Sequence, residues 1–164
     1  MERLWAGWRG EYVAAAGQGD PERSVFRRIL ESGRPDDETY IVWRGDQCFA
    51  ILNAFPYTTG HMLLMPYREV GELEDLSVGE SAELWSAVTD AVRALKAAYQ
   101  PHGVNVGVNI GEAGGAGVPD HLHVHVLPRW NADSNFMTAV AETRVLPESL
   151  PVTWGRLRAT WPKD

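Results

Sequence analysis

The stretch "DHLHVHVLPRW" at residues 120–130 places His121, His123 and His125 at alternate positions with apolar residues between them. Such alternation is typical of a strand, whose successive side chains point to opposite faces. We therefore expect a strand over 121–127, with three imidazoles on one face and the apolar residues toward the core. Three imidazoles are costly to bury without partners. The row therefore indicates a functional site.

The rest of the chain predicts the elements around this strand. A helix capping box joins Ser77 and Glu80 at the start of a long apolar stripe, which predicts a helix over 77–99. A shorter helix is predicted between Pro21 and Gly33. Further strands are predicted over residues 39–44, 48–53, 61–66 and 103–111. Because no βαβ unit repeats, the pattern favours an α+β fold: a mainly antiparallel sheet with one long helix and a short N-terminal helix.

A chain of 164 residues is expected to form one main domain. We place an aromatic-rich N-terminal arm at 1–20, the main domain at 21–140 and a C-terminal tail at 141–164. Within the tail, "TWGRLRATW" is a candidate short helix.

Composition excludes several classes of partner and location. The net charge of -7 disfavours nucleic-acid binding, which depends on basic surfaces. No stretch approaches the roughly 20 apolar residues of a membrane span, so no membrane association is expected. Cys48 is the single cysteine, so no internal disulfide can form and a reducing compartment is favoured. The N-terminus lacks the pattern of a signal peptide. We therefore expect a cytoplasmic protein.

Two chemistries compete for the three histidines. Alternate histidines on a strand can chelate zinc, but a structural zinc site normally needs four ligands, and no HExxH helix or carboxylate cluster completes the set. Alternatively, the middle imidazole attacks a phosphorus atom while its neighbours orient it or protonate the leaving oxygen. The glycine-rich "GEAGGAGVPD" at 111–120 supports this second reading, because its backbone N–H groups can converge on an anion.

The segment "HLHVHVL" fits the pattern His-φ-His-φ-His-φ-φ, with φ apolar, and resembles the histidine triad (HIT) nucleotide hydrolases and transferases. The segments "LWAGWRGEY", "FAILNAFPYTTGHMLLMPYREVGELEDL", "NVGVNIG" and "PRWNADSNF" are similar in particular to the bacterial diadenosine-tetraphosphate (Ap4A) phosphorylase-like branch. The resemblance covers most of residues 1–147. It implies that 21–140 is a HIT-like nucleotide-binding catalytic domain.

The resemblance implies roles for individual residues. His123 would be the nucleophile that becomes transiently AMP-modified, and His121 and His125 would orient it and contact phosphate or the leaving group. His61 would be a fourth histidine near the phosphates. The implied substrate-binding residues are Asn53 for ribose, Ile51 for the base, and, on the phosphate side, Asn109 and the backbone of Gly115, Ala116, Gly117 and Val118.

The implied activity is cleavage of dinucleoside polyphosphates at the α-phosphate through a covalent AMP-histidine intermediate, with phosphate or water as the acceptor. Two alternatives stay open: an adenosine 5'-phosphoramidase, which hydrolyses a P–N bond, and a nucleotide-binding protein with little turnover. The resemblance also implies a homodimer that acts on a small nucleotide substrate.

The sequence departs from many relatives at two places. Ser24 and Arg27 stand where those relatives carry a CxxC pair, so we expect no zinc and no tightly bound cofactor, with Mg²⁺ acting only by complexing the substrate. Residues 114–117 are all Gly and Ala, where many relatives have a glutamine. Backbone amides would therefore carry more of the phosphate binding.

Overall fold

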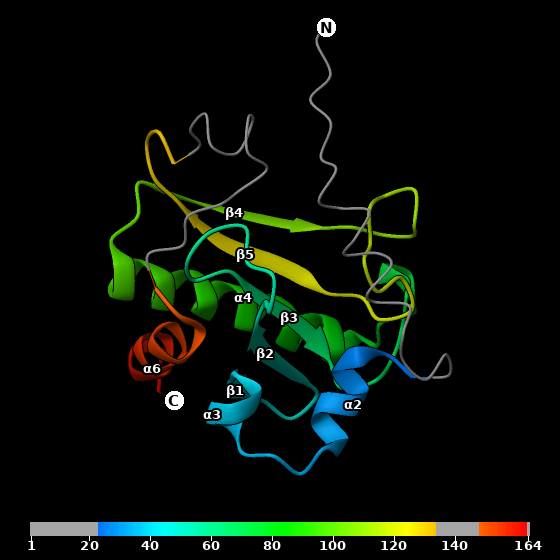
Figure 1. Cartoon of the computed structure of the whole chain (residues 1–164). Coiled ribbons are helices and arrows are strands. Elements are labelled where there is room, and N and C mark those ends of the chain that lie inside the picture. The colour runs from blue at the N-terminus through cyan, green and yellow to red at the C-terminus, as the bar shows by residue number, and fades with distance from the viewer. Residues whose placement is uncertain (1–22, 134–147, 164) are drawn as a thin grey trace, which may run out of the picture.

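A computed structural model describes residues 23–133 and 148–163 of the chain. Five strands form one antiparallel sheet in the order β1-β2-β3-β5-β4 (Figure 1). The strands are β1 (Ile41–Arg44), β2 (Cys48–Leu52), β3 (Met62–Pro66), β4 (Gly103–Val108) and β5 (Val124–Arg129). The helices are α2 (Val25–Glu31), α3 (Asp36–Thr39), the 3-10 helix η1 (Leu73–Asp75), α4 (Val78–Tyr99) and α6 (Leu150–Thr160). The predicted α+β fold is therefore confirmed, with α4 as the long helix and α2 as the short helix before the sheet.

Helix α4 covers one face of the sheet (Figure 1). Its predicted capping box is present: the Ser77 side chain accepts the N–H of Glu80, and the Glu80 side chain accepts the N–H of Ser77. The buried apolar side chains of α4 are Leu84, Ala87, Val88, Ala91, Ala94 and Leu95. No helix in the described ranges is long and apolar enough to cross a membrane.

The central strands are buried on both faces. Ala50 and Leu64 belong to the core under α4, whereas Ile51 and Leu63 belong to a second core cluster that includes Phe26 of α2. Directly paired residues lie on the same face of a sheet, and His125 pairs with Leu63. The histidine face of β5 is therefore the face that α2 covers, opposite α4.

Helix α6 joins the same body as the sheet. Leu157 is fully buried, and the Trp154 indole N–H donates a 2.8 Å hydrogen bond to the carbonyl of Ile41. Trp161 stacks on Trp43 with ring centroids 5.6 Å apart. The short helix predicted in the C-terminal segment is thus confirmed. The predicted N-terminal arm lies outside the described residues, and the domain boundaries stay predictions.

The largest error of the sequence reading concerns the histidine strand. β5 begins at Val124, not at residue 121. The backbone before it bonds elsewhere: the N–H of Leu122 donates to Val70, and that of His121 donates to Val118. Because these groups point away from the neighbouring strands, His121 and His123 precede the ladder instead of belonging to it. Helix α3, with four residues, was not predicted.

The capping box generates a prediction about acid stability. Glu80 is only 6% exposed and also accepts hydrogen bonds of 3.0 and 2.8 Å from the Arg68 guanidinium. Hydrogen bonding by Arg68, followed by that of Ser77, lowers the pKa of Glu80 from 4.5 to about 2. The stabilisation from ionised Glu80 is therefore complete above pH 4.5 and is lost as the pH falls toward 2.

We expect Glu80→Gln to reduce the free energy of unfolding at pH 7 by about 1 to 2 kcal/mol, a figure lowered because Arg68 is half-exposed. The difference from wild type should shrink in acid, as measured by urea denaturation over a pH series. Glu74→Gln, at an exposed position of η1, serves as the control. A Glu80 difference that is the same at pH 7 and pH 3 would contradict the assignment.

Candidate active site

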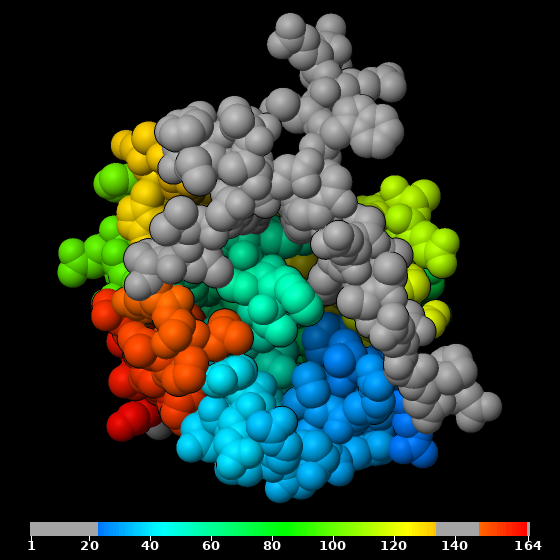
Figure 2. Space-filling model, in the orientation of Figure 1, coloured from blue at the N-terminus to red at the C-terminus, as the bar shows by residue number. Residues whose placement is uncertain are grey.

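The structure brings four of the five histidines together on the α2 side of the sheet. His125 comes from β5, His61 lies directly before β3, and His121 and His123 lie in the segment that leads into β5. The ring centroids of His123 and His125 are 5.0 Å apart, and those of His61 and His125 are 5.1 Å apart. His61, His121 and His123 are buried. In Figure 2 the loop that leads to His61, residues 53–61, lies between α6 in orange-red and α2 in blue.

His123 has the geometry of a nucleophile. Its Nδ1 lies 2.8 Å from the carbonyl oxygen of His121. A carbonyl can only accept, so Nδ1 carries the proton and donates, and Nε2 keeps its lone pair. Burial lowers the pKa of His123, which keeps the ring neutral at neutral pH. A neutral imidazole with a lone pair on Nε2 can attack phosphorus.

His61 and His125 form a second hydrogen-bonded pair. The backbone N–H of Tyr57 donates to Nδ1 of His61 at 3.1 Å, so a neutral His61 carries its proton on Nε2. That nitrogen lies 2.9 Å from Nδ1 of His125 and donates to it. His125 then carries its own proton on Nε2. The Tyr57 ring stacks on His125, with ring centroids 5.9 Å apart and an interplanar angle of 13°.

Protein groups hold both ring nitrogens of His121. Nε2 lies 2.8 Å from the carbonyl oxygen of Pro66, and Nδ1 lies 2.8 Å from the hydroxyl of Ser24. Burial lowers the pKa of His121. His121 therefore contacts His123 through its backbone carbonyl, not through its ring.

The residues expected to bind the nucleoside lie on the same face. Ile51 pairs with Leu63, and Leu63 pairs with His125. With strands about 4.8 Å apart, Ile51 lies about 10 Å across the sheet from His125. Asn53 follows β2, where its Oδ1 accepts the N–H of Phe55 at 3.0 Å and its Nδ2 lies 3.4 Å from Nδ1 of His61. Asn53 is thus next to the histidines.

The glycine-rich loop is folded on itself. Asn109 Nδ2 donates to the carbonyl of Gly115 at 3.3 Å. The N–H of Gly115 donates to Glu112, and that of Ala116 donates to Gly111. A Cβ at residue 114 would clash with the carbonyl of Ile110, so the fold of the loop requires glycine there.

These hydrogen bonds reduce the number of backbone N–H groups in the predicted anion site that can bind an anion. Two of its four N–H groups, those of Gly115 and Ala116, are used inside the loop. Across the described ranges, the N–H groups of Gly117 and Val118 make no backbone hydrogen bond. The Val118 carbonyl accepts the N–H of His121 at 3.2 Å, which ties the end of the loop to the triad. Gly117 and Val118 are therefore the better candidates to bind an anion.

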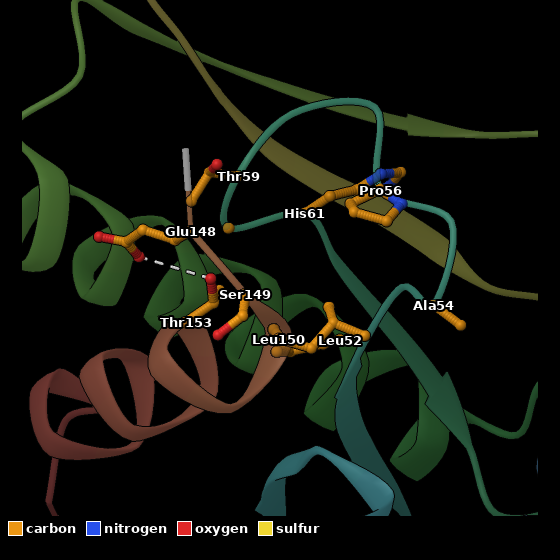
Figure 3. Close-up of a pocket in the computed structure, with 10 residues that line it drawn as sticks. Leu52, Ala54, Pro56, Thr59, His61, Glu148, Ser149, Leu150 and Thr153 are labelled. Carbon is orange, nitrogen blue, oxygen red and sulfur yellow. Dashed lines mark hydrogen bonds between the residues drawn. The ribbon is translucent and has the colours of Figure 1, made fainter. Parts of the chain in front are cut away.

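A pocket of about 220 Å³ lies next to His61, between residues 52–61 and the start of α6 (Figure 3). Its lining residues are Leu52, Ala54, Pro56, Thr59, Gly60, His61, Glu148, Ser149, Leu150 and Thr153. The lining has one charged group, the carboxylate of Glu148, which pairs with Arg156 at 3.0 Å. A pocket whose one charged lining group is a carboxylate does not favour a polyphosphate.

Sequence reasoning missed the groups that position the histidines. The rings of Tyr57 and Phe26 and the carbonyl of Pro66 contact the four imidazole rings. These contacts depend on the fold and cannot be read from the sequence. Ser24 left a signal: as the N-cap of α2 it accepts the N–H of Arg27 at 3.1 Å. The sequence prediction starts this helix at Pro21 instead and so does not identify Ser24 as its N-cap.

The described residues offer no cluster of ligands for a metal ion. Across 23–133 and 148–163, no group of three or more His, Cys, Asp or Glu is arranged to hold a metal ion. At one of the two positions where relatives carry cysteines, Ser24 bonds to His121. The ligands present there do not fit the set that zinc requires.

Comparisons with known proteins agree with this geometry. The HIT domain family model matches residues 34–132. A protein from Mycobacterium tuberculosis (strain H37Rv) called AP-4-A phosphorylase is 41% identical over 170 residues, covering 100% of this chain and 86% of that protein. The asymmetrical bis(5'-nucleosyl)-tetraphosphatase of Schizosaccharomyces pombe is 32% identical over 93 residues, 57% of this chain and 50% of that protein.

A solved structure shows the same fold. The crystal structure of a zinc-bound histidine triad family protein from Mycobacterium smegmatis superposes with a TM-score of 0.68 at 27% identity, covering 84% of this chain and 91% of that chain. The family model extends over more than half of this chain and includes all four clustered histidines. The chain belongs to the histidine triad (HIT) family.

Proposed function

We propose that this protein is a HIT-type enzyme that cleaves dinucleoside polyphosphates of the Ap4A type at the α-phosphate, through a covalent AMP-histidine intermediate. The observation that carries the proposal is the hydrogen bond from Nδ1 of His123 to the carbonyl of His121, because it directs the lone pair of Nε2 away from the protein backbone. The full-length relative from M. tuberculosis, called AP-4-A phosphorylase, supports the substrate class.

The reaction proceeds in two displacements. Nε2 of His123 attacks the α-phosphorus, the bond to the bridging oxygen breaks, and ATP leaves from Ap4A. The N–H on Nε2 of His125 donates a hydrogen bond to the leaving oxygen, which departs as an oxyanion of ATP, and His61 holds His125 in this tautomer through its bond to Nδ1. An oxygen of inorganic phosphate or water then attacks the AMP group, which releases ADP or AMP and restores His123.

Substrate binding is local because the net charge of -7 repels a polyanion. We place the base against Ile51 and the ribose hydroxyls at Asn53. The phosphates lie at the N–H groups of Gly117 and Val118, where fixed dipoles stabilise developing negative charge. Asn109 supports this loop through its bond to Gly115. We expect no tightly bound cofactor, and Mg²⁺ enters only as a complex with the substrate.

Two other functions use the same pocket. An adenosine 5'-phosphoramidase would break a P–N bond with the same nucleophile, and a binding protein would hold nucleotide with little turnover. Side-by-side product analysis with Ap4A and an adenosine phosphoramidate separates the first, and saturable binding without product supports the second. The arrangement of His61, His123 and His125 favours turnover, because it supplies both a lone pair and a proton donor.

We expect His123→Ala and His123→Asn to abolish Ap4A cleavage while nucleotide binding and the thermal midpoint change little. The reason is that the substitutions remove the attacking nitrogen and leave the fold intact. His102→Ala is the matched control, since His102 is exposed and bonds to Asn131 outside the cluster. Undiminished turnover by either His123 variant, measured as ATP release, would refute the assignment.

The acceptor is tested on the intermediate. Protein labelled with radioactive Ap4A, freed of nucleotide and treated with EDTA, should discharge to ADP when inorganic phosphate is added and to AMP in water alone. We expect phosphate to speed the discharge, in agreement with the phosphorylase relative. We expect discharge of the intermediate without metal because the site supplies its own hydrogen-bond donors to the phosphate. Failure of EDTA-treated intermediate to discharge, with recovery on adding a metal, would contradict a metal-free step.

We also propose a twofold homodimer through β4. Within the described residues β4 pairs with β5 alone, and Val106 is 44% exposed on it. An unpaired edge strand readily pairs with a second copy. Sedimentation equilibrium at micromolar concentration should give twice the mass of one chain, and Val106→Arg should shift the measured mass toward that of a single chain. Val152→Arg, on the exposed side of α6, is the control. A wild-type monomer would contradict the proposal.

The chemistry of the single cysteine supports a proposal about location. Burial raises the pKa of the Cys48 thiol to about 12, so the only cysteine of the chain is an unreactive core residue. A chain without a disulfide suits a reducing compartment, and we propose the cytoplasm. Fractionation that finds the protein outside the cytoplasm would contradict this.

A further inference from the structure

We propose that Ser24 is a positioning residue for the nucleophile: its hydroxyl hydrogen-bonds to Nδ1 of His121 and holds the orientation of that ring, and the backbone carbonyl of His121 in turn holds His123. The catalytic consequence rests on the function proposed above. The bond between Ser24 and His121 does not, and it can be measured in the protein without substrate.

The direction of the Ser24 bond follows from its neighbours. Nε2 of His121 faces the carbonyl of Pro66 at 2.8 Å, and a carbonyl only accepts, so the Nε2 proton is required. Burial lowers the pKa of His121, so the ring is neutral and Nδ1 has a lone pair. The hydroxyl of Ser24, 2.8 Å away, is therefore placed to donate to Nδ1, and the Glu69 carboxylate, whose pKa a hydrogen bond from the Ser24 side chain lowers, is the competing acceptor.

Ser24 is itself held in place from two sides. Its Oγ accepts the N–H of Arg27 at 3.1 Å, as the N-cap of α2. Its own N–H donates to Glu69 at 2.7 Å. The oxygen of the hydroxyl is thus fixed between α2 and the segment after β3, within hydrogen-bonding distance of His121.

The ring of His121 matters because its carbonyl lies outside the β ladder. β5 begins three residues later, at Val124, so sheet hydrogen bonds do not orient this carbonyl. The ring bonds to Ser24 and Pro66 do so instead. In the other tautomer the lone pair of Nε2 would face the lone pairs of Pro66, and the ring would have to turn. Phe26, also on α2, packs edge-on against His121, with ring centroids 5.4 Å apart.

The test separates the hydroxyl from the helix cap. Glycine at an N-cap costs little helix stability, and aspartate caps well. Glycine has no side-chain donor, and an ionised aspartate has no proton to donate, so neither residue can donate to Nδ1 of His121. We expect Ser24→Gly and Ser24→Asp to lower kcat for Ap4A about 10-fold, with KM and the thermal midpoint nearly unchanged. Ser24→Thr, which keeps the hydroxyl, should stay within about 3-fold of wild type.

The matched control is Ser32→Ala, at the other end of α2. Ser32 donates to the carbonyl of Ile29 at 2.7 Å and is not part of the histidine cluster, so its kcat should match wild type. Wild-type kcat in Ser24→Gly would overturn the proposal. It would also be overturned if Ser24→Thr were as impaired as Ser24→Gly, because then the hydroxyl would not be the group that matters.

The second readout is ¹⁵N NMR of the histidine rings in the protein without substrate. We expect His121 to be the Nε2–H tautomer in wild type and both variants, because the Pro66 carbonyl requires that proton. The Nδ1 resonance should move downfield in Ser24→Gly, where the hydroxyl donor is lost, and stay near its wild-type position in Ser24→Thr. An Nδ1–H tautomer in wild type, or an unchanged Nδ1 resonance in Ser24→Gly, would overturn the proposal. If wild type fails to cleave Ap4A, the proposed function fails, whereas these spectra still decide the role of Ser24.

Discussion

The hydrogen bond from Nδ1 of His123 to the carbonyl of His121, 2.8 Å long, is the constraint on which the rest of the site depends. An imidazole has two chemically similar nitrogens, and only one can present a lone pair when the ring is neutral. The carbonyl accepts the proton on Nδ1, so the lone pair of the neutral ring is on Nε2, the nitrogen proposed to attack. The ring bonds of His121 position this carbonyl, and the bond between His61 and His125 places an N–H donor beside the His123 ring.

The sheet contributes the spacing of the site. Ile51, Leu63 and His125 stand in one row across β2, β3 and β5, on the face opposite α4. Because paired residues in neighbouring strands are about 4.8 Å apart, a nucleoside lying across this row would have its base over apolar side chains and its phosphates at the histidines. Helix α4 covers the other face and leaves this one to α2 and the ligand.

The fold was largely predictable because the signals for it are local. Short apolar runs bounded by turn residues predicted β2 and β3, alternation predicted β4 and β5, and the capping box at Ser77 predicted the start of α4. The row of histidines was located correctly, but its first two members were wrongly placed inside a strand. What stops the ladder before Val124 is the bond from Leu122 to Val70, a contact between distant segments that no periodicity encodes.

The same distinction explains which parts of the site stayed hidden. The types and spacing of the histidines indicate phosphorus chemistry, whereas their tautomers depend on groups such as the Pro66 carbonyl and the Tyr57 N–H. These are backbone groups, which every residue has, so no residue type marks them in a sequence. Ser24 is the exception, because a serine before a helix predicts a cap, but its second bond to His121 follows from the fold alone.

Burial gives the cluster a further property, which follows from the cost of placing charge in the interior. Four cationic histidines would bind a polyphosphate well, but none would keep a lone pair for attack. Burial instead lowers the pKa of both His121 and His123, which favours neutral rings in a protein of net charge -7. Attraction for the substrate is thereby weaker. In exchange, the ring of His123 can offer a lone pair while His125, in the opposite tautomer, can offer an N–H donor, and the proposed displacement uses both groups.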